Sequence, residues 1–228
     1  MRSERSRLLL ALTALTLVGA CSSGGPQAAP APASIPTTAS APTATATATA
    51  NSTPSATATT APGRLVPEAL QSRWWNWAGG TAAIVSPVTD QDGKRCGHRQ
   101  TPDVWFLAGT TGGHAERSCT VPAGVPIALP LVNLMGTDEQ CRTFMATAQG
   151  EAVLDGRALQ PERVEATTAT LFLGANNPFT GKRSTGSATL CGLWVQLDPP
   201  SPGAHRLTIS GSSADFSTSV AYALTVGT

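Results

Sequence analysis

The 228-residue sequence predicts a mainly β domain, an antiparallel β-sandwich or jelly-roll-like fold with two short helices, preceded by a disordered tether. Three observations support this fold class. The residues before 64 are of low complexity, the remainder contains short apolar runs bounded by glycine and proline, and the last segment alternates apolar and polar side chains with a period of two.

Residues 1–20 have the layout of a bacterial signal peptide. Three arginines precede an apolar run from Leu8 to Val18, which is too short to span a bilayer. The run ends in LVGAC at residues 17–21, which resembles the lipobox of bacterial lipoproteins. The resemblance implies that Cys21 is lipidated and anchors the protein at the extracytoplasmic face of the cell membrane. An ordinary secretory signal with an unrelated cysteine is the alternative.

Residues 21–63 follow as a tether rich in Ala, Thr, Pro and Ser, with no charged residue between Arg7 and Arg64. A segment with so little large apolar surface cannot offset its ordering entropy, so we expect it to be disordered. Residues 64–228 then form one domain. Removing residues 1–20 takes away three arginines and one glutamate and leaves 12 basic and 13 acidic side chains. This balance gives no indication of a nucleic-acid partner.

The domain opens with VPEALQSRWWNWAGG, which predicts a helix that starts at Pro67 and ends at the glycines 79–80. At 100° per residue, one stripe of the helix contains Val66, Leu70, Trp74 and Trp77, and the two tryptophans are expected to pack on a sheet. Trp75 lies on the flank of this stripe, so it could be buried or could offer a binding surface.

The following segments are predicted mainly as β-strands, with one further helix. The second helix is expected in TDEQCRTFMATAQG (137–150), with Thr137 as its N-cap. Asp155-Gly156 indicates a type I′ turn within a hairpin at 151–161. Strands are expected at 82–86, 104–109, 119–122, 127–133, 164–173, 190–197, 205–210 and 216–226. In the last of these, Val220, Tyr222 and Leu224 share one face, so we expect that face to be buried.

Four cysteines remain after Cys21, and an even number in an exported domain predicts two disulfides. Three pairings are possible. We favour Cys96–Cys119 with Cys141–Cys191, because sequential pairs close loops that do not cross. A metal site is the weaker alternative, since no CxxC or HExxH motif is present and the histidines are scattered. We expect no metal and no cofactor.

Several stretches together are similar to a family of bacterial secreted proteins and lipoproteins: RWWNWA, SPVTDQDGKRC, VWFLAGTTGG, ERSCTVPAGVPIALPLVN, LDGRAL and PPSPGAHRLTISG with FSTSVAYALTV. The similarity covers about residues 66–228. It implies no activity and no catalytic residue. It includes Cys96 and Cys119 in the shared pattern, whereas Cys191 stands where the family pattern has an acidic residue. The closing strands also resemble immunoglobulin-like adhesive modules.

The sequence offers no recognisable catalytic constellation, so no catalytic residue is predicted. His98, His114 and His205 are the candidate bases, but no GxSxG motif supplies a nucleophile. His114 lies in a glycine-rich stretch that is expected to be a loop between strands, and no helix follows to make it a nucleotide site. Asp90-Gln91-Asp92-Gly93 lacks the further acids of a calcium loop and is expected to form a tight turn.

The candidate ligand-binding residues lie on the helix and on one long loop. The loop Gly174–Ser187 is polar and joins two strands, and loops on a rigid sandwich often bind ligands. Its Asn176, Asn177, Lys182 and Arg183 are the candidates, together with Trp75. An exposed tryptophan beside amides suits a sugar, and Trp194 is a further aromatic of this kind. A mobile loop without a ligand is the alternative.

These observations predict a lipid-anchored envelope protein whose domain is a non-catalytic binding or interaction module. Its ligand would be an envelope polysaccharide or a surface protein. A secreted hydrolase with a dispersed active site is one alternative, which a cleft with a histidine–carboxylate pair would favour. A purely structural envelope protein is the other, which an exposed sheet edge would favour.

Overall fold

The computed structural model describes residues 63–228. The predictions of a signal peptide, of lipidation at Cys21 and of a disordered tether therefore lie outside the described residues, apart from Gly63. The helices are α1 (Pro67–Gly79), the 3₁₀ turn η1 (Ala83–Val85) and α2 (Asp138–Thr147). The strands are β1 (Trp105–Phe106), β2 (Gly113–Val121), β3 (Ile127–Gly136), β4 (Gln149–Leu154), β5 (Arg157–Leu159), β6 (Glu162–Leu173), β7 (Ser184–Leu197), β8 (Gly203–Ser213) and β9 (Phe216–Val226).

Two sheets make up the domain, which confirms the mainly β prediction with two helices. The first sheet has the order β1-β3-β7-β6 and the second has the order β2-β9-β8-β4-β5. Most neighbours are antiparallel, but each sheet contains one parallel pair, β1 with β3 and β2 with β9. The sheets are therefore mixed, where the sequence predicted antiparallel ones. The chain reaches β2 directly from β1, so it leaves the first sheet and joins the second.

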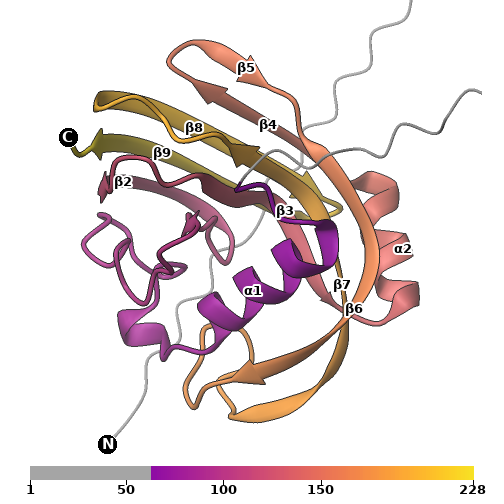
Figure 1. Ribbon diagram of the computed structural model, residues 1–228. Helices are drawn as coiled ribbons and strands as arrows, with labels where there is room; N and C mark the ends of the chain where they lie inside the picture. Colours follow the sequence, from indigo (N-terminus) through magenta and orange to yellow (C-terminus); the bar gives the residue numbers. More distant parts are fainter. Residues whose placement is uncertain (1–62) are drawn as a thin grey trace, which may run out of the picture. The chain divides into compact units, whose positions relative to one another are not determined.

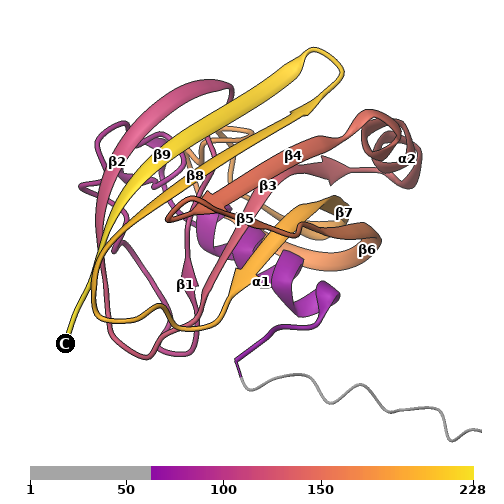
Figure 2. The ribbon, with the colours of Figure 1, turned by 90° about the horizontal axis from the view of Figure 1, so that it is seen from above.

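The first sheet is covered on both faces. Helix α1 lies in the curl of β6 and β7 (Figure 1), and the second sheet lies across the opposite face (Figure 2). Strand β7 is consequently buried without interruption from Thr189 to Val195, and β3 from Ile127 to Val132. A strand buried on both faces shows a continuous apolar run instead of alternation. In β9, by contrast, Val220, Tyr222 and Leu224 are buried while Ala223 is exposed, as predicted.

Two apolar clusters fill the spaces between these layers. The larger lies between the sheets and contains all four cysteines of the domain. The bonds Cys96–Cys119 and Cys141–Cys191 are both present, which confirms the predicted pairing. The smaller cluster joins α1 to the first sheet and contains Leu70 and Trp194.

Helix α1 matches its predicted bounds, because Pro67 occupies its first turn and Gly80 caps its last turn through a bond to the Asn76 carbonyl. Trp74, Trp75 and Trp77 are all buried. Trp74 and Trp77 each donate from Nε1 to a backbone carbonyl, of Leu107 at 2.9 Å and of His98 at 2.9 Å. These bonds satisfy the polar atom of each indole in the apolar cluster.

The second helix and the hairpin are also confirmed. Thr137 and Gln140 form a reciprocal capping box at the start of α2. Asp155 and Gly156 have φ values of 51° and 82°, as a type I′ turn requires, and they join β4 to β5.

Several bounds differ from the prediction. Helix α2 ends at Thr147, before the predicted stop at Gly150, which belongs to β4, and β1 covers only Trp105–Phe106 of the predicted strand 104–109. Residues 82–86 are not a strand: Ala83–Val85 form a single 3₁₀ turn outside both sheets, and the Ala83 amide bonds to the Asn176 carbonyl. His114 lies within β2, which starts at Gly113. Strand β7 starts at Ser184, so the predicted long loop is confined to residues 174–183. Across residues 63–228, none of the helices is both long enough and apolar enough to cross a membrane.

Candidate functional site

A pocket of about 430 Å³ lies at the point where the chain crosses from the first sheet to the second. Its walls come from α1, from the crossover residues 109–111, from the second half of β3, from the loop 174–183 and from the start of β9. We call it the tryptophan pocket. Its lining residues are Trp74, Trp75, Val88, Gly109, Thr110, Thr111, Pro130, Leu131, Val132, Asn133, Leu134, Met135, Pro178, Phe179, Thr180, Phe216 and Thr218.

The pocket exists because β1 is much shorter than β3. Strand β1 pairs only with Ile127 and Ala128, and the Leu107 amide makes the last bond, to the Ala128 carbonyl at 3.0 Å. The chain then turns away, and Thr110 bonds to the side chain of Thr218 on β9 at 2.9 Å. Beyond Ala128, therefore, β3 continues without its neighbour, and the space beside it remains open.

The roof of the pocket is the loop 174–183, which Asn177 holds in shape. The Asn177 amide donates to the carbonyls of Gly174 and Lys182, and its oxygen accepts from the amides of Phe179 and Thr180. This network points Phe179 inward, where its ring lies 4.7 Å from the ring of Trp75, centroid to centroid. Trp75 also meets Trp74 edge to face at 5.2 Å. Trp75 is therefore only 4% exposed.

The lining of the pocket is uncharged and mostly apolar, but it holds polar atoms without partners. Trp75 Nε1 and Asn133 Nδ2 are buried and have no hydrogen-bond partner among the described residues. Both are donors, and a buried donor without an acceptor costs about 1–3 kcal/mol. Buried polar atoms of this kind are normally satisfied by water or by a ligand. A concave apolar site with a few polar groups is the usual form of a binding pocket.

The predicted binding residues do not all lie together. Trp75 lines the pocket. Asn177 is buried in the loop that covers it, and its polar atoms are occupied by that loop. Asn176, Lys182 and Arg183 are exposed on the same loop. Asn176 has a φ of 56° and its carbonyl accepts from Ala83, so it joins the loop to η1.

The pocket also uses residues that the sequence analysis did not single out, notably Asn133, Met135, Thr110 and Phe216. They come from three separate segments. The only indication in the sequence was Asn133, a polar side chain at the end of the apolar run IALPLVN. Trp194 is fully buried on the first sheet and packs against Trp74 at 5.8 Å.

His205 forms the closest histidine–carboxylate pair, but both of its nitrogens are engaged. Nδ1 lies 2.7 Å from Asp155 Oδ2, and Nε2 lies 2.8 Å from the Ser201 carbonyl. The Asp155 hydrogen bond raises the pKa of His205, and the same bond lowers the pKa of Asp155. With no free nitrogen to accept a substrate proton, this imidazole fastens the 154–157 turn to β8.

His114 lies in a second, polar depression of about 690 Å³ over the outer face of the second sheet. Its Nδ1 is 2.9 Å from Ser219 Oγ, and its Nε2 is 3.7 Å from Glu116. The three residue types are those of a hydrolytic triad, but Ser219 stands in the middle of β9, between β2 and β8. Its backbone amide is in a sheet ladder and is not available as an oxyanion donor, which acyl transfer needs.

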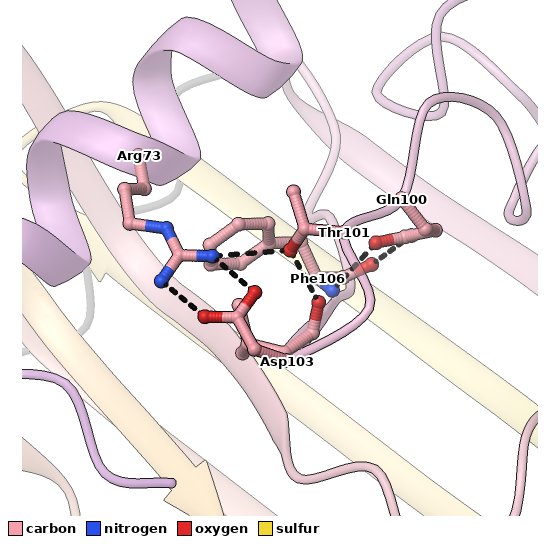
Figure 3. Close-up of polar contacts among 6 residues, drawn as sticks. Arg73, Gln100, Thr101, Asp103 and Phe106 are labelled. Atoms are coloured by element: carbon pink, nitrogen blue, oxygen red, sulfur yellow. Dashed lines mark hydrogen bonds and ion pairs between the residues drawn. The ribbon is translucent and has the colours of Figure 1, made fainter.

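Arg73 holds the outer side of α1 to the residues before β1 (Figure 3). Its guanidinium makes two bonds to the Asp103 carboxylate, of 2.8 and 2.7 Å, and one to Thr101. These bonds hold the pKa of Asp103 at about 2. Beside them the Gln100 amide pairs with the backbone N–H and carbonyl of Phe106. These contacts hold the outer side of α1 against the segment that precedes β1.

Arg117 on β2 is a buried cation without a salt bridge in the described structure. Its guanidinium donates to the carbonyls of Asp90, Ala108 and Val88 and to the Tyr222 hydroxyl. The bond to Ala108 holds the crossover segment next to the tryptophan pocket. Asp90 and Asp92 lie in the tight turn that was predicted, where they accept backbone bonds from Arg95 and Lys94. Among residues 63–228, no three His, Cys, Asp or Glu side chains lie close enough together to hold a metal ion.

Comparison with known proteins gives no family. No family model matches the chain, and no curated protein matches it. Among solved structures, the cysteine protease inhibitor EhICP2 from Entamoeba histolytica is 9% identical, covers 53% of this chain and 95% of its own, and has a TM-score of 0.25. Amebosin is 10% identical, with 55% and 99% covered and a TM-score of 0.23. A family 123 glycoside hydrolase from Clostridium perfringens is 11% identical, with 49% and 22% covered and a TM-score of 0.24. These scores are too low to support an argument about fold or function.

Proposed function

We propose that this chain is a non-catalytic binding module of a lipid-anchored bacterial envelope protein, and that its ligand enters the tryptophan pocket. The ligand is an envelope component, either a polysaccharide or a surface protein. The observation that supports the proposal is an uncharged pocket of about 430 Å³ whose lining holds two buried donors without partners.

The chemistry of the lining favours binding over catalysis. Among the described residues that line the pocket, none carries a carboxylate, an imidazole, an ammonium or a guanidinium group. General acid–base catalysis needs a titratable group within hydrogen-bond reach of the substrate. Trp75 Nε1 and Asn133 Nδ2 instead suit a neutral ligand that carries acceptor oxygens.

The pocket can be tested with a neutral apolar fluorophore, N-phenylnaphthylamine, added to the purified full chain. We expect saturable binding with a gain in probe fluorescence, because the lining is aromatic and uncharged. Thr111→Trp should abolish this binding. Thr111 lines the pocket, is exposed and makes no side-chain hydrogen bond to any of residues 63–228, so a large side chain there obstructs the pocket at little structural cost.

Thr120→Trp is the matched control. Thr120 is exposed on β2 and does not line the pocket, so this variant should bind the probe like the unaltered chain. Envelope polysaccharides and envelope protein extracts are then used as competitors. Equal probe binding by both tryptophan variants would refute the proposed site. Displacement by one class of competitor only would identify that class as the ligand.

A further inference from the structure

Strand β3 has a free backbone edge beside the tryptophan pocket. From Pro130 to Gly136 β3 pairs with β7 on one side, and within residues 63–228 no strand pairs with its other side. Pro130 fits this arrangement. The carbonyls of Pro126 and Ala128 face β1, so alternation places Pro130 on the same side, where its missing N–H leaves no ladder bond unmade.

The same alternation identifies which backbone groups face the pocket side. On β7 the Leu190 carbonyl is directed toward β6, where it accepts from Gln71 at 3.0 Å. Cys191 and Leu193 therefore face β3, and they bond to their partners Leu134 and Val132. The N–H and carbonyl groups of Asn133 and Met135 point away from β7. Both residues line the tryptophan pocket.

On the other two outer strands of the first sheet, β6 and β1, side-chain amides bond to backbone groups that none of the described strands pairs with. Asn76 accepts from the Phe172 amide at 2.7 Å and donates to the Thr170 carbonyl at 3.2 Å along β6. Gln100 closes β1 in the same way at Phe106 (Figure 3). Proteins protect sheet edges because an open edge pairs with other chains. In the described chain, the β3 edge at Asn133 and Met135 has no such cover.

The free edge and the pocket together define what can occupy them. A strand edge offers a donor and an acceptor at every second residue, which matches the repeat of another extended backbone. The uncharged lining matches an uncharged occupant, and the aromatic side chains of Trp75, Phe179 and Phe216 match an apolar side chain. Sugar binding by stacking needs a bare aromatic face, whereas the Trp75 ring is packed against Phe179 and Trp74.

We infer that an extended, uncharged stretch of a partner polypeptide pairs with β3 at Asn133 and Met135 and places an apolar side chain in the tryptophan pocket. This inference rests on the proposed function and selects the protein ligand over the polysaccharide. Addition of a strand to a sheet edge, with side-chain pockets for specificity, is an established mode of peptide recognition.

The test uses three capped hexapeptides of alternating valine and threonine. The first is unmethylated, the second is methylated on the backbone nitrogens of the valines, and the third is methylated on the backbone nitrogens of the threonines. Displacement of N-phenylnaphthylamine from the full chain reports binding. We expect the unmethylated peptide to displace the probe. One of the two methylated versions should bind about tenfold more weakly than the other, because only one edge of an added strand faces β3.

A pair of variants at one position tests the protein side. Asn133→Ala removes the side-chain amide, and Asn133→Pro removes in addition the backbone N–H that faces the pocket. Neither removes a ladder bond to β7, so both should fold. We expect peptide affinity to fall further in Asn133→Pro than in Asn133→Ala, by about tenfold, while probe affinity stays equal in the two variants.

The outcomes separate the inference from the proposed function. If the probe binds and is blocked by Thr111→Trp, but no peptide displaces it, the pocket stands and strand addition is refuted. Strand addition would also be refuted if the two methylated peptides bound with equal affinity. The same holds if the two Asn133 variants bound the unmethylated peptide with equal affinity. Displacement by polysaccharide alone would replace the peptide with a glycan. If the chain associates with itself and Asn133→Pro abolishes that association, a second copy of the chain takes the place of the partner polypeptide.

Discussion

Individual polar residues hold the crossover segment and the turns in place. Arg117 is the clearest example, because one buried guanidinium satisfies carbonyls from two separate segments, 88–90 and 108–109, and contacts Tyr222. A planar group with several donors can do this, whereas an ammonium is a compact point charge. His205 has a comparable role at the surface, where it joins the 154–157 turn to β8.

We predict that Arg117→Lys lowers the free energy of unfolding by at least about 2 kcal/mol, because several buried carbonyls lose their donors while a charge stays buried. Urea denaturation of the full chain measures the change. Arg206→Lys is the control, since Arg206 is exposed on β8, and its effect should stay within about 0.5 kcal/mol. Similar losses in both variants would contradict this role of Arg117.

We predict that the stabilisation lost in His205→Asn depends on pH. The pKa of His205 is raised above 6.5, so its contribution is complete below pH 6.5 and disappears as the pH rises through the raised value. The pKa of Asp155 is lowered below 3.8, so its contribution is complete above pH 3.8 and disappears as the pH falls through the lowered value. The difference in unfolding free energy between the two proteins should therefore be greatest between pH 3.8 and 6.5 and smaller outside this window. Denaturation curves across this range would contradict the prediction if the difference were constant.

At the scale of elements, α1 does more than cover an apolar face. Its polar residues complete the hydrogen bonding of the sheet beneath it. Gln71 is fully buried and donates to the Leu190 carbonyl and to Thr167, beside the bulge between Val164 and Thr167 where β6 and β7 lose register. Asn76 does the same along β6. The helix thereby protects one edge of the sheet, and β3 is left as the edge with a pocket beside it.

We predict that Gln71→Met lowers the free energy of unfolding by about 1–3 kcal/mol, although the two side chains have similar lengths. The reason is that the buried Leu190 carbonyl loses its donor, and the half-buried Thr167 hydroxyl loses a hydrogen-bond partner. Gln160→Met is the control, because Gln160 is exposed, and it should have little effect. Chemical denaturation compares the two, and equal stabilities would show that the bulge does not depend on Gln71.

At the scale of the whole molecule, each of the two disulfides joins a segment outside the sheets to a strand. Cys96–Cys119 ties the irregular segment before β1 to β2, and Cys141–Cys191 ties α2 to β7. Their cysteines are 23 and 50 residues apart in the chain. Both belong to the cluster between the sheets, which also contains Leu131 and Val132 of the pocket lining.

We predict that replacing Cys96 and Cys119 by alanine lowers the free energy of unfolding by about 3 kcal/mol, and replacing Cys141 and Cys191 by about 4 kcal/mol. The larger loop loses more because its closure restricts the unfolded chain more strongly. Urea denaturation of the two double variants gives the order. A greater loss for the shorter loop would show that packing in the folded state, and not loop closure, dominates.

The sequence by itself determined the elements whose determinants are local. The ends of α1, the Thr137 cap at the start of α2, the Asp155-Gly156 turn and the alternation of β9 all depend on residues within a few positions of one another, and each was predicted correctly. The mainly β class and the cysteine pairing were also predictable, because short apolar runs and sequential cysteines allow few arrangements. The predicted binding role of Trp75, Asn176, Asn177, Lys182 and Arg183 stays a prediction.

Only the tertiary structure decided the site. Whether Trp75 was buried or exposed depended on Phe179, more than a hundred positions away, which the loop around Asn177 turns onto its ring. The pocket arises because β1 ends early and the chain changes sheets, and no local pattern records where a strand loses its neighbour. Residues 82–86 show the converse, since an apolar run became a 3₁₀ turn outside both sheets. The open edge of β3 and the residues around it depend on which distant segments pair with one another. A local sequence pattern does not specify that pairing.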